Sequence, residues 1–116
     1  MVRMLAEVAC LAAVLWAEAR GEGYTGQLLV ADVVFNRVYD PRWPSTICEV
    51  TEQQFVSKKG QGADWWLTVA LADDLYRRRV LLPETGAVYF NTKGTTNDYG
   101  VYLFTYRNHR FYSAPP

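Results

Sequence analysis

LWAEARGEGY, residues 15–24, places two glutamates, an arginine and two glycines directly after an apolar segment. Upstream of it, apolar residues recur every three or four positions, which is the period of one buried helix face. They are Val2, Leu5, Val8, Ala9, Ala12, Leu15 and Trp16. Gly21 follows this pattern, and glycine just past the last periodic residue is a usual helix stop. The sequence therefore predicts a helix that ends near Arg20 or Gly21, with Glu18 in its last turn.

Glu18 stands where a carboxylate is electrostatically unfavourable, because the unpaired carbonyls of a helix C-terminus repel negative charge. Leu15 and Trp16 lie close by in sequence, and an apolar cleft wall would desolvate the carboxyl and raise its pKa further. Both effects favour a protonated carboxyl near neutral pH, which is the state that a general acid needs. The competing interpretation is an exposed helix-end carboxylate that pairs with Arg20.

A second helix is predicted from Thr25, as its cap, through residues 36–38. Its additional valines extend the apolar surface beyond one stripe, so we expect it to be central and buried on more than one side. Residues 39–45 contain two prolines and predict a loop. Thr51 with Gln54 three residues later is a plausible capping box for one short helical turn.

The second half changes in character. Residues 55–63 have no hydrophobic period and predict a flexible loop, which could move over a substrate. Asp64 can cap a third helix that runs to Arg79. Trp66 lies off the buried stripe of that helix, so it is expected at the surface. Three short strands are then predicted at residues 87–91, 101–106 and 110–112, with a polar loop at 92–100 and a turn at 107–109. Residues 1–116 should form one α+β domain, mainly helical, with a small C-terminal β-hairpin or sheet.

Composition excludes several classes of protein. The net charge is zero and the only basic run is residues 77–79, which argues against nucleic-acid binding. No stretch of 18 apolar residues is present, so we expect no membrane insertion. Cys10 and Cys48 have no metal-ligand spacing and the chain has one histidine, so we expect neither a metal site nor a cofactor. We interpret the cysteines as buried free thiols, with a disulfide left open by the even count.

The motif AEARGE at residues 17–22, followed by a helix that ends in NRV at 36–38, resembles the SleB-type cell-wall hydrolases, which include the spore-cortex-lytic enzymes. Further landmarks follow in the same order along the chain. They are Pro44, Ile47, Val50, Gln54-Phe55, Tyr89-Phe90-Asn91, Asn108-His109 and Phe111-Tyr112. Arg107 stands where the family pattern has a glycine, so the turn there is expected to be built differently.

The resemblance implies a lysozyme-like fold with a sugar-binding groove between the helices and the sheet. It also implies cleavage of the peptidoglycan glycan strand, with Glu18 as the catalytic glutamate. The muramic acid 6-hydroxyl attacks the sugar carbon in a lytic transglycosylase, and water attacks in a muramidase. The candidates for substrate contact are Glu22, Gln54, Tyr89, Asn91, His109 and Tyr112. Glu22 would support the turn or bridge to Arg20, and His109 would fix a turn by hydrogen bonding.

Arg3 and the apolar residues after it look like a secretion signal, but Glu7 interrupts the run. Cleavage after Ala17 would remove the helix that presents Glu18, so we expect no signal peptide. A monomer made in the cytoplasm would then reach the wall after phage lysis, or by another export route. Two alternatives stay open: a non-catalytic peptidoglycan-binding module, and a hydrolase active only within a virion or spore-coat assembly.

Overall fold

A computed structural model describes residues 2–92 and 100–116, apart from the side chain of Gln54. The helices, α-helical except for the 3-10 turns η1 and η2, are α1 (Val2–Ala19), η1 (Arg20–Glu22), α2 (Gly23–Tyr39), α3 (Ile47–Gln54), α4 (Gly62–Arg77) and η2 (Arg79–Leu81). The strands are β1 (Tyr89–Thr92), β2 (Val101–Tyr106) and β3 (His109–Ser113). The predicted α+β class, mainly helical with a small C-terminal sheet, is confirmed. No described helix has the length and apolar character needed to span a bilayer.

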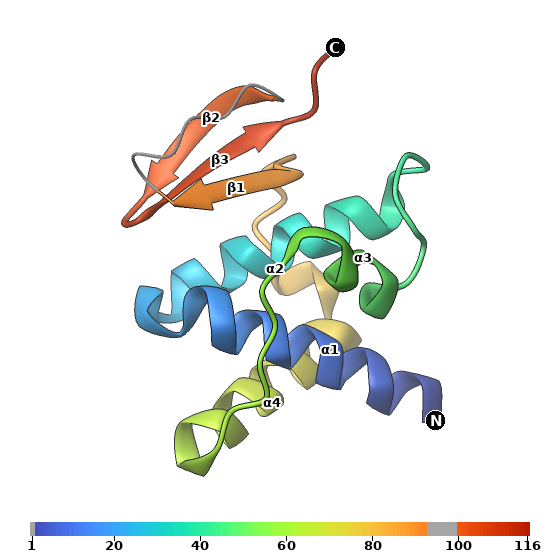
Figure 1. The fold of residues 1–116 in the computed structure, drawn as a ribbon, viewed down its shortest axis with the longest axis vertical. Helices are drawn as coiled ribbons and strands as arrows, with labels where there is room; N and C mark the ends of the chain where they lie inside the picture. The colour runs from blue at the N-terminus through green and yellow to red at the C-terminus, as the bar shows by residue number, and fades with distance from the viewer. Residues whose placement is uncertain (1, 93–99) are drawn as a thin grey trace.

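Helix α2 lies between the sheet on one side and α1, α3 and α4 on the other (Figure 1). Its face toward the sheet carries Leu29 and Val33, which pack with Phe111. The opposite face carries Val30 and Val34, which belong to the larger cluster among the helices. The expectation of a central helix buried on more than one side is therefore confirmed.

The strands form one antiparallel sheet in the order β1-β3-β2. The turn between β2 and β3 is made by Arg107 and Asn108, and Arg107 has a φ of 51°. That left-handed conformation is the one that glycine adopts most readily, which explains why a glycine suits this position. Arg107 thus adopts the backbone conformation that a glycine would adopt there, and the expectation of a differently built turn stays a prediction.

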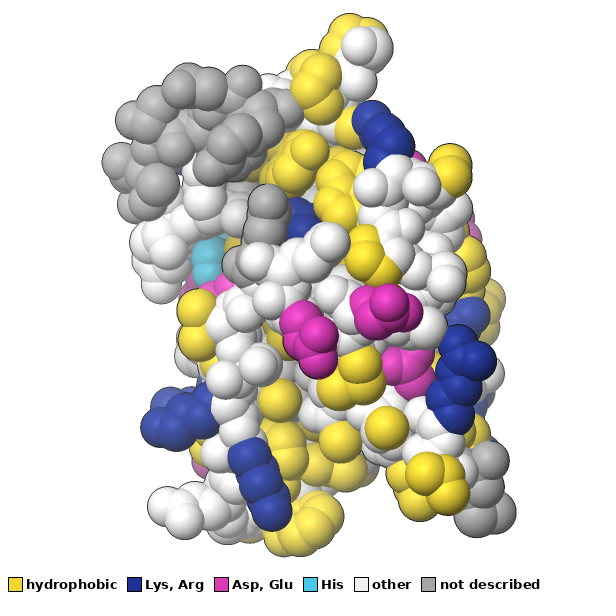
Figure 2. Space-filling view, turned by 45° about the vertical axis from the view of Figure 1, so that its right-hand side comes forward, with side chains coloured by type: hydrophobic (Ala, Val, Ile, Leu, Met, Phe, Trp, Pro, Cys, Tyr) yellow, Lys and Arg dark blue, Asp and Glu magenta, His cyan; other side chains and the backbone are white. Residues whose placement is uncertain are grey.

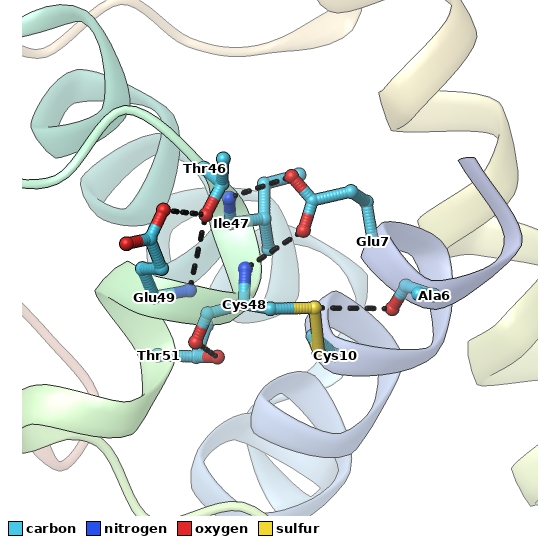
Figure 3. The surroundings of a disulfide bond; sticks show 8 residues. All are labelled: Ala6, Glu7, Cys10, Thr46, Ile47, Cys48, Glu49 and Thr51. Atoms are coloured by element: carbon cyan, nitrogen blue, oxygen red, sulfur yellow. Dashed lines mark hydrogen bonds between the residues drawn. A yellow bond between two sulfur atoms is a disulfide. The ribbon is translucent and has the colours of Figure 1, made fainter. Parts of the chain in front are cut away.

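Helix α3 is fastened to α1 at its N-terminal end (Figure 3). The buried carboxylate of Glu7 accepts hydrogen bonds from the backbone N–H groups of Ile47 and Cys48, at 3.0 and 2.8 Å. An acidic group is favourable at this end of a helix. The contact brings Cys10 and Cys48 together with their Cα atoms 5.3 Å apart, and they form a disulfide.

The interpretation of the cysteines as free thiols was therefore wrong. Cys10 and Cys48 are 38 positions apart, and the tertiary packing of α1 against α3, which includes the Glu7 contact, makes them neighbours. A crosslink that closes a loop of this length stabilises a fold by about 3–4 kcal/mol, chiefly by restricting the unfolded chain.

Three predicted helix caps also need correction. Helix α2 begins at Gly23, so Thr25 lies inside its first turn and does not cap it. Thr46, not Thr51, caps α3: its hydroxyl accepts from the backbone N–H of Glu49 at 3.3 Å. Helix α4 begins at Gly62, two residues before Asp64, and ends at Arg77. The N-cap residues of α2 and α4, Glu22 and Gln61, make no side-chain cap, so in both helices the nearest residue with a strong capping preference lies inside the first turn.

Candidate active site

Glu18 lies in the last turn of α1 as predicted, and its side chain is half-buried. Burial raises the pKa of Glu18 above 4.5, and a hydrogen bond from the Val56 backbone N–H opposes that rise. Desolvation is the larger of the two effects. Burial thus shifts the Glu18 carboxyl toward its protonated form. The partial negative charge of the helix C-terminus shifts it in the same direction.

The raised pKa of Glu18 predicts how stability depends on pH. The folded protein binds the Glu18 proton more tightly than the unfolded chain, so folding stability falls as pH rises from 4.5 to the folded pKa. Glu18→Gln removes this loss. In urea titrations the variant should equal the native protein near pH 3.5, where Glu18 of the native protein is mainly protonated in both the folded and the unfolded state. Near pH 8 the variant should be the more stable of the two. Equal stability of the two proteins at both pH values would contradict the assigned desolvation.

Residues 55–61, here named the strap, connect α3 to α4 and cross α1 (Figure 1). The Lys58 backbone N–H donates to the carbonyl of Ala13 at 3.0 Å. Gly60 lies against Trp16 so closely that an added Cβ would be 2.3 Å from the indole ring. With the bond from Val56 to Glu18, the strap is fixed to α1 at three points. We predicted this segment as a loop, and the contacts fix its path beside Glu18.

Glu22 is buried, with 6% of its surface exposed, at the end of η1. Its carboxylate accepts from the Asn108 backbone N–H at 3.0 Å and from the Asn108 amide at 3.4 Å. Nδ1 of His109 lies 3.5 Å from the same carboxylate. Figure 2 shows the histidine beside an acidic side chain on this face. Glu22 therefore joins the turn after Glu18 to the turn between β2 and β3.

His109 is buried between Glu22 and the ring of Phe90, whose centroid is 5.0 Å away. Burial lowers the pKa of His109 below 6.5, and the negative charge of Glu22 opposes this. The imidazole is then mainly neutral near pH 7. A neutral histidine held between two partners fits the predicted turn-fixing role, which stays a prediction.

Tyr89, Asn91 and Tyr112 are brought together on one face of the sheet. Tyr89 pairs with Tyr112 across β1 and β3, and the Tyr112 hydroxyl donates to the Asn91 amide oxygen at 3.3 Å. Because side chains alternate along a strand, this face is opposite to the one that carries Phe90 and His109. The structure thus places the predicted groove residues in two groups. Gln54 is the last residue of α3, and its side chain lies outside the described part of the chain.

The NRV motif has a structural role that the sequence did not reveal. The Asn36 amide donates to the carbonyl of Ala87 at 2.8 Å, and Nε of Arg37 donates to the carbonyl of Val88 at 2.6 Å. Arg37 is buried, and desolvation lowers its pKa to about 10. These bonds fix the chain entering β1 to α2. A signal was available: Arg37 is a charged residue in a helix stretch that is otherwise predicted to be buried.

Asp32, one turn earlier in α2, was also missed. It is buried, and it accepts from the backbone N–H groups of Glu84 and Thr85 at 3.1 and 3.0 Å. The Thr85 hydroxyl donates to it at 2.6 Å. Asp32 and the NRV residues therefore fasten residues 84–88 to the central helix, and so position the sheet against it.

Two hollows lie on either side of Arg20. One of about 440 Å³ is lined by Arg20, Tyr24, Gln27, Asp64, Leu67, Thr68 and Leu71. The other, of about 240 Å³, is lined by Trp16, Arg20, Lys58, Lys59, Gly60 and Gln61. Glu18 lines neither of them. Within the described residues, no three of the His, Cys, Asp and Glu side chains are grouped so that they could hold a metal ion.

Two solved structures have this fold and define its class. The first is the catalytic domain of the germination-specific lytic transglycosylase SleB from Bacillus anthracis, with a TM-score of 0.71 and 22% identity, covering 92% of this chain and 93% of that one. The second is the catalytic domain of the Bacillus cereus SleB protein, with a TM-score of 0.69 and 22% identity, covering 92% and 89%. The chain therefore has the fold of these SleB domains.

Residues 21–112 match the Cell Wall Hydrolase family, and the chain belongs to that family of enzymes. A spore cortex-lytic enzyme from Halalkalibacterium halodurans is 30% identical over 90 residues, which are 72% of this chain. The chain spans 26% of the length of that relative. The predicted SleB-type family is therefore confirmed. Glu18 lies three positions before the matched residues begin.

Proposed function

We propose that this chain cleaves the glycan strand of peptidoglycan as a lytic transglycosylase, with Glu18 as its single general acid and base. The observation that carries the proposal is the half-buried carboxyl of Glu18, whose pKa is raised by desolvation, in a member of the cell wall hydrolase family. The lytic transglycosylase activity named for the Bacillus anthracis structure favours this route over hydrolysis.

In the first step the protonated Glu18 donates its proton to the glycosidic oxygen as the bond to the muramic acid C1 breaks. The 6-hydroxyl of the same muramic acid then bonds to C1 and gives its proton to the Glu18 carboxylate. One glycosidic bond between sugars is exchanged for one internal glycosidic bond between C1 and O6, no water is consumed, and Glu18 returns to its acid form. A single carboxyl is sufficient for this sequence of steps.

Glu22 supports the site in this proposal and does not act as a second catalytic carboxylate. Its oxygens are engaged by Asn108, and its side chain is almost fully buried. Gln54, Tyr89, Asn91, His109 and Tyr112 remain candidates for positioning the strand. The protein acts as a monomer, without membrane insertion and without nucleic acid.

The site of action lies outside the reducing cytoplasm. A disulfide such as Cys10–Cys48 persists in oxidising compartments and is rare where thiols are kept reduced. The chain is made in the cytoplasm and meets the wall after phage lysis or export, and the disulfide closes on arrival.

Mass spectrometry of digested walls tests the proposed reaction. Purified peptidoglycan incubated with the native protein should release fragments that end in anhydromuramic acid. Such fragments are lighter by one water than those that end in a reducing sugar. Reducing ends alone would show that water is the nucleophile. Binding to walls without any release of fragments would instead favour a binding module.

A further inference from the structure

The smaller hollow beside Arg20 is lined by three cationic side chains and by no acidic one. Arg20, Lys58 and Lys59 supply the charge, and we name this site the cationic hollow, lined also by Trp16, Gly60 and Gln61. The whole chain has a net charge of zero, so this local excess of positive charge is not a property of the overall composition.

None of the three cations is neutralised within the part of the chain that the structure describes. The ion pairs there are Arg42–Asp40, Arg77–Asp73, Arg78–Asp74 and His109–Glu22. Asp64 lines the neighbouring hollow together with Arg20, but it forms no ion pair with it. Three cations around one hollow repel one another, so an anion bound there would be favourable.

The hollow is also held in place by its backbone and by an aromatic ring. The guanidinium of Arg20 stacks over the indole of Trp16 at 4.2 Å from the ring centroid. Gly60 packs against the same ring, and the backbone of Lys58 is bonded to α1. The backbone that carries the cations is therefore fixed before a ligand arrives, which reduces the entropy lost on binding.

Glu18 does not line the hollow, but the strap and the end of α1 connect the two places along the backbone. Arg20 follows Glu18 by two residues, and Lys58 follows Val56, which donates to Glu18, by two residues. Two extended residues span about 7 Å, so the substituents of a strand bound at Glu18 could reach the cationic hollow if they were a few residues long. In peptidoglycan these substituents are short peptides that bear free carboxylates.

We propose that the cationic hollow binds a carboxylate of the peptide stem attached to the glycan strand. This inference rests on the proposed function, because it takes the substrate to be peptidoglycan. Arg20 holds the carboxylate through its planar guanidinium, and Lys58 and Lys59 add screened attraction from the strap. The site thus selects strands that still carry their peptides over strands that have lost them.

Binding of defined fragments tests the inference without depending on cleavage. In a Glu18→Gln background, calorimetry would compare a tetrasaccharide with peptide stems, the same tetrasaccharide without stems, and one whose stem carboxylates are amidated. The stem-bearing fragment should bind roughly tenfold more tightly than the other two at low salt. This preference should weaken as salt is raised, since exposed charges are screened.

Substitution of the two lysines tests whether the preference for stem-bearing fragments arises at the cationic hollow. Lys58→Gln with Lys59→Gln removes two exposed charges that form no side-chain hydrogen bond or ion pair among the described residues, so folding should be preserved. This variant should bind the stem-bearing fragment roughly fivefold more weakly and the stem-free fragment equally well. Arg3→Gln, at the far end of α1, is the matched control for loss of a positive charge and should change neither affinity.

Three outcomes would overturn the inference. They are equal affinity for the three fragments, an unchanged affinity in the lysine variant, and tighter binding of a glycerol phosphate oligomer than of the stem-bearing fragment. The last outcome would assign the hollow to a phosphate polymer of the wall. If fragments bind as expected but the native protein leaves walls uncut, the hollow stands and the proposed reaction fails.

Discussion

Glu18→Gln should lower the rate of peptidoglycan cleavage by about 10⁴-fold, because glutamine keeps the shape of the side chain but has no proton to donate. The same group donates the proton to the leaving oxygen and later accepts the proton of the 6-hydroxyl. Both steps fail in the variant. Release of soluble fragments from purified walls, followed over time by turbidity and mass spectrometry, measures the loss.

Glu52→Gln is the matched control for this experiment. Glu52 is an exposed glutamate of α3 with no hydrogen bond or ion pair among the described residues, so its substitution should leave the rate unchanged. Circular dichroism would show that both variants are folded. A Glu18→Gln protein as active as the native one would remove Glu18 from the mechanism and leave the proposed function without its acid.

The candidate acid could be found from sequence because its placement depends on local signals. Apolar residues at helical spacing and the glycines that follow fix where α1 ends, and Glu18 is carried to that end with them. The helical period of α2 likewise predicted its central place. The features that could be predicted, the end of α1 and the central place of α2, are therefore those that ten to twenty neighbouring residues specify.

The contacts that complete the site join residues far apart in the chain. Glu22 meets Asn108 across 86 positions, and Arg37 meets Val88 across 51. Cys10 meets Cys48 across 38 positions, beside the contact of Glu7 with the N-terminus of α3. No periodicity or cap signals such a pairing, which explains why Asn108 was not predicted as the partner of Glu22 and why the cysteines were expected to be free.

Glu22→Ala tests whether Glu22 supports the turn between β2 and β3. Glu22→Ala leaves the Asn108 N–H without its acceptor in a buried place, which should lower the free energy of unfolding by about 2–3 kcal/mol. The turn between β2 and β3 would also lose its connection to the residues that follow Glu18. A displacement of that turn by about 1 Å could reduce the cleavage rate by about 10²-fold. Urea titration and the wall-cleavage assay measure the two effects.

Glu22→Gln keeps an amide oxygen that can accept from the Asn108 N–H while it removes the negative charge. If Glu22 only supports the turn, this variant should retain a cleavage rate within about tenfold of the native one, far above that of Glu18→Gln. If Glu22 were the second carboxylate of a muramidase, the two glutamine variants would be comparably inactive, because hydrolysis needs a base or nucleophile as well as an acid. Formation of anhydro products requires a single carboxyl. Release of such products by Glu22→Gln would therefore show that the buried Glu22 carboxylate is not needed for the reaction, as the transglycosylase route predicts.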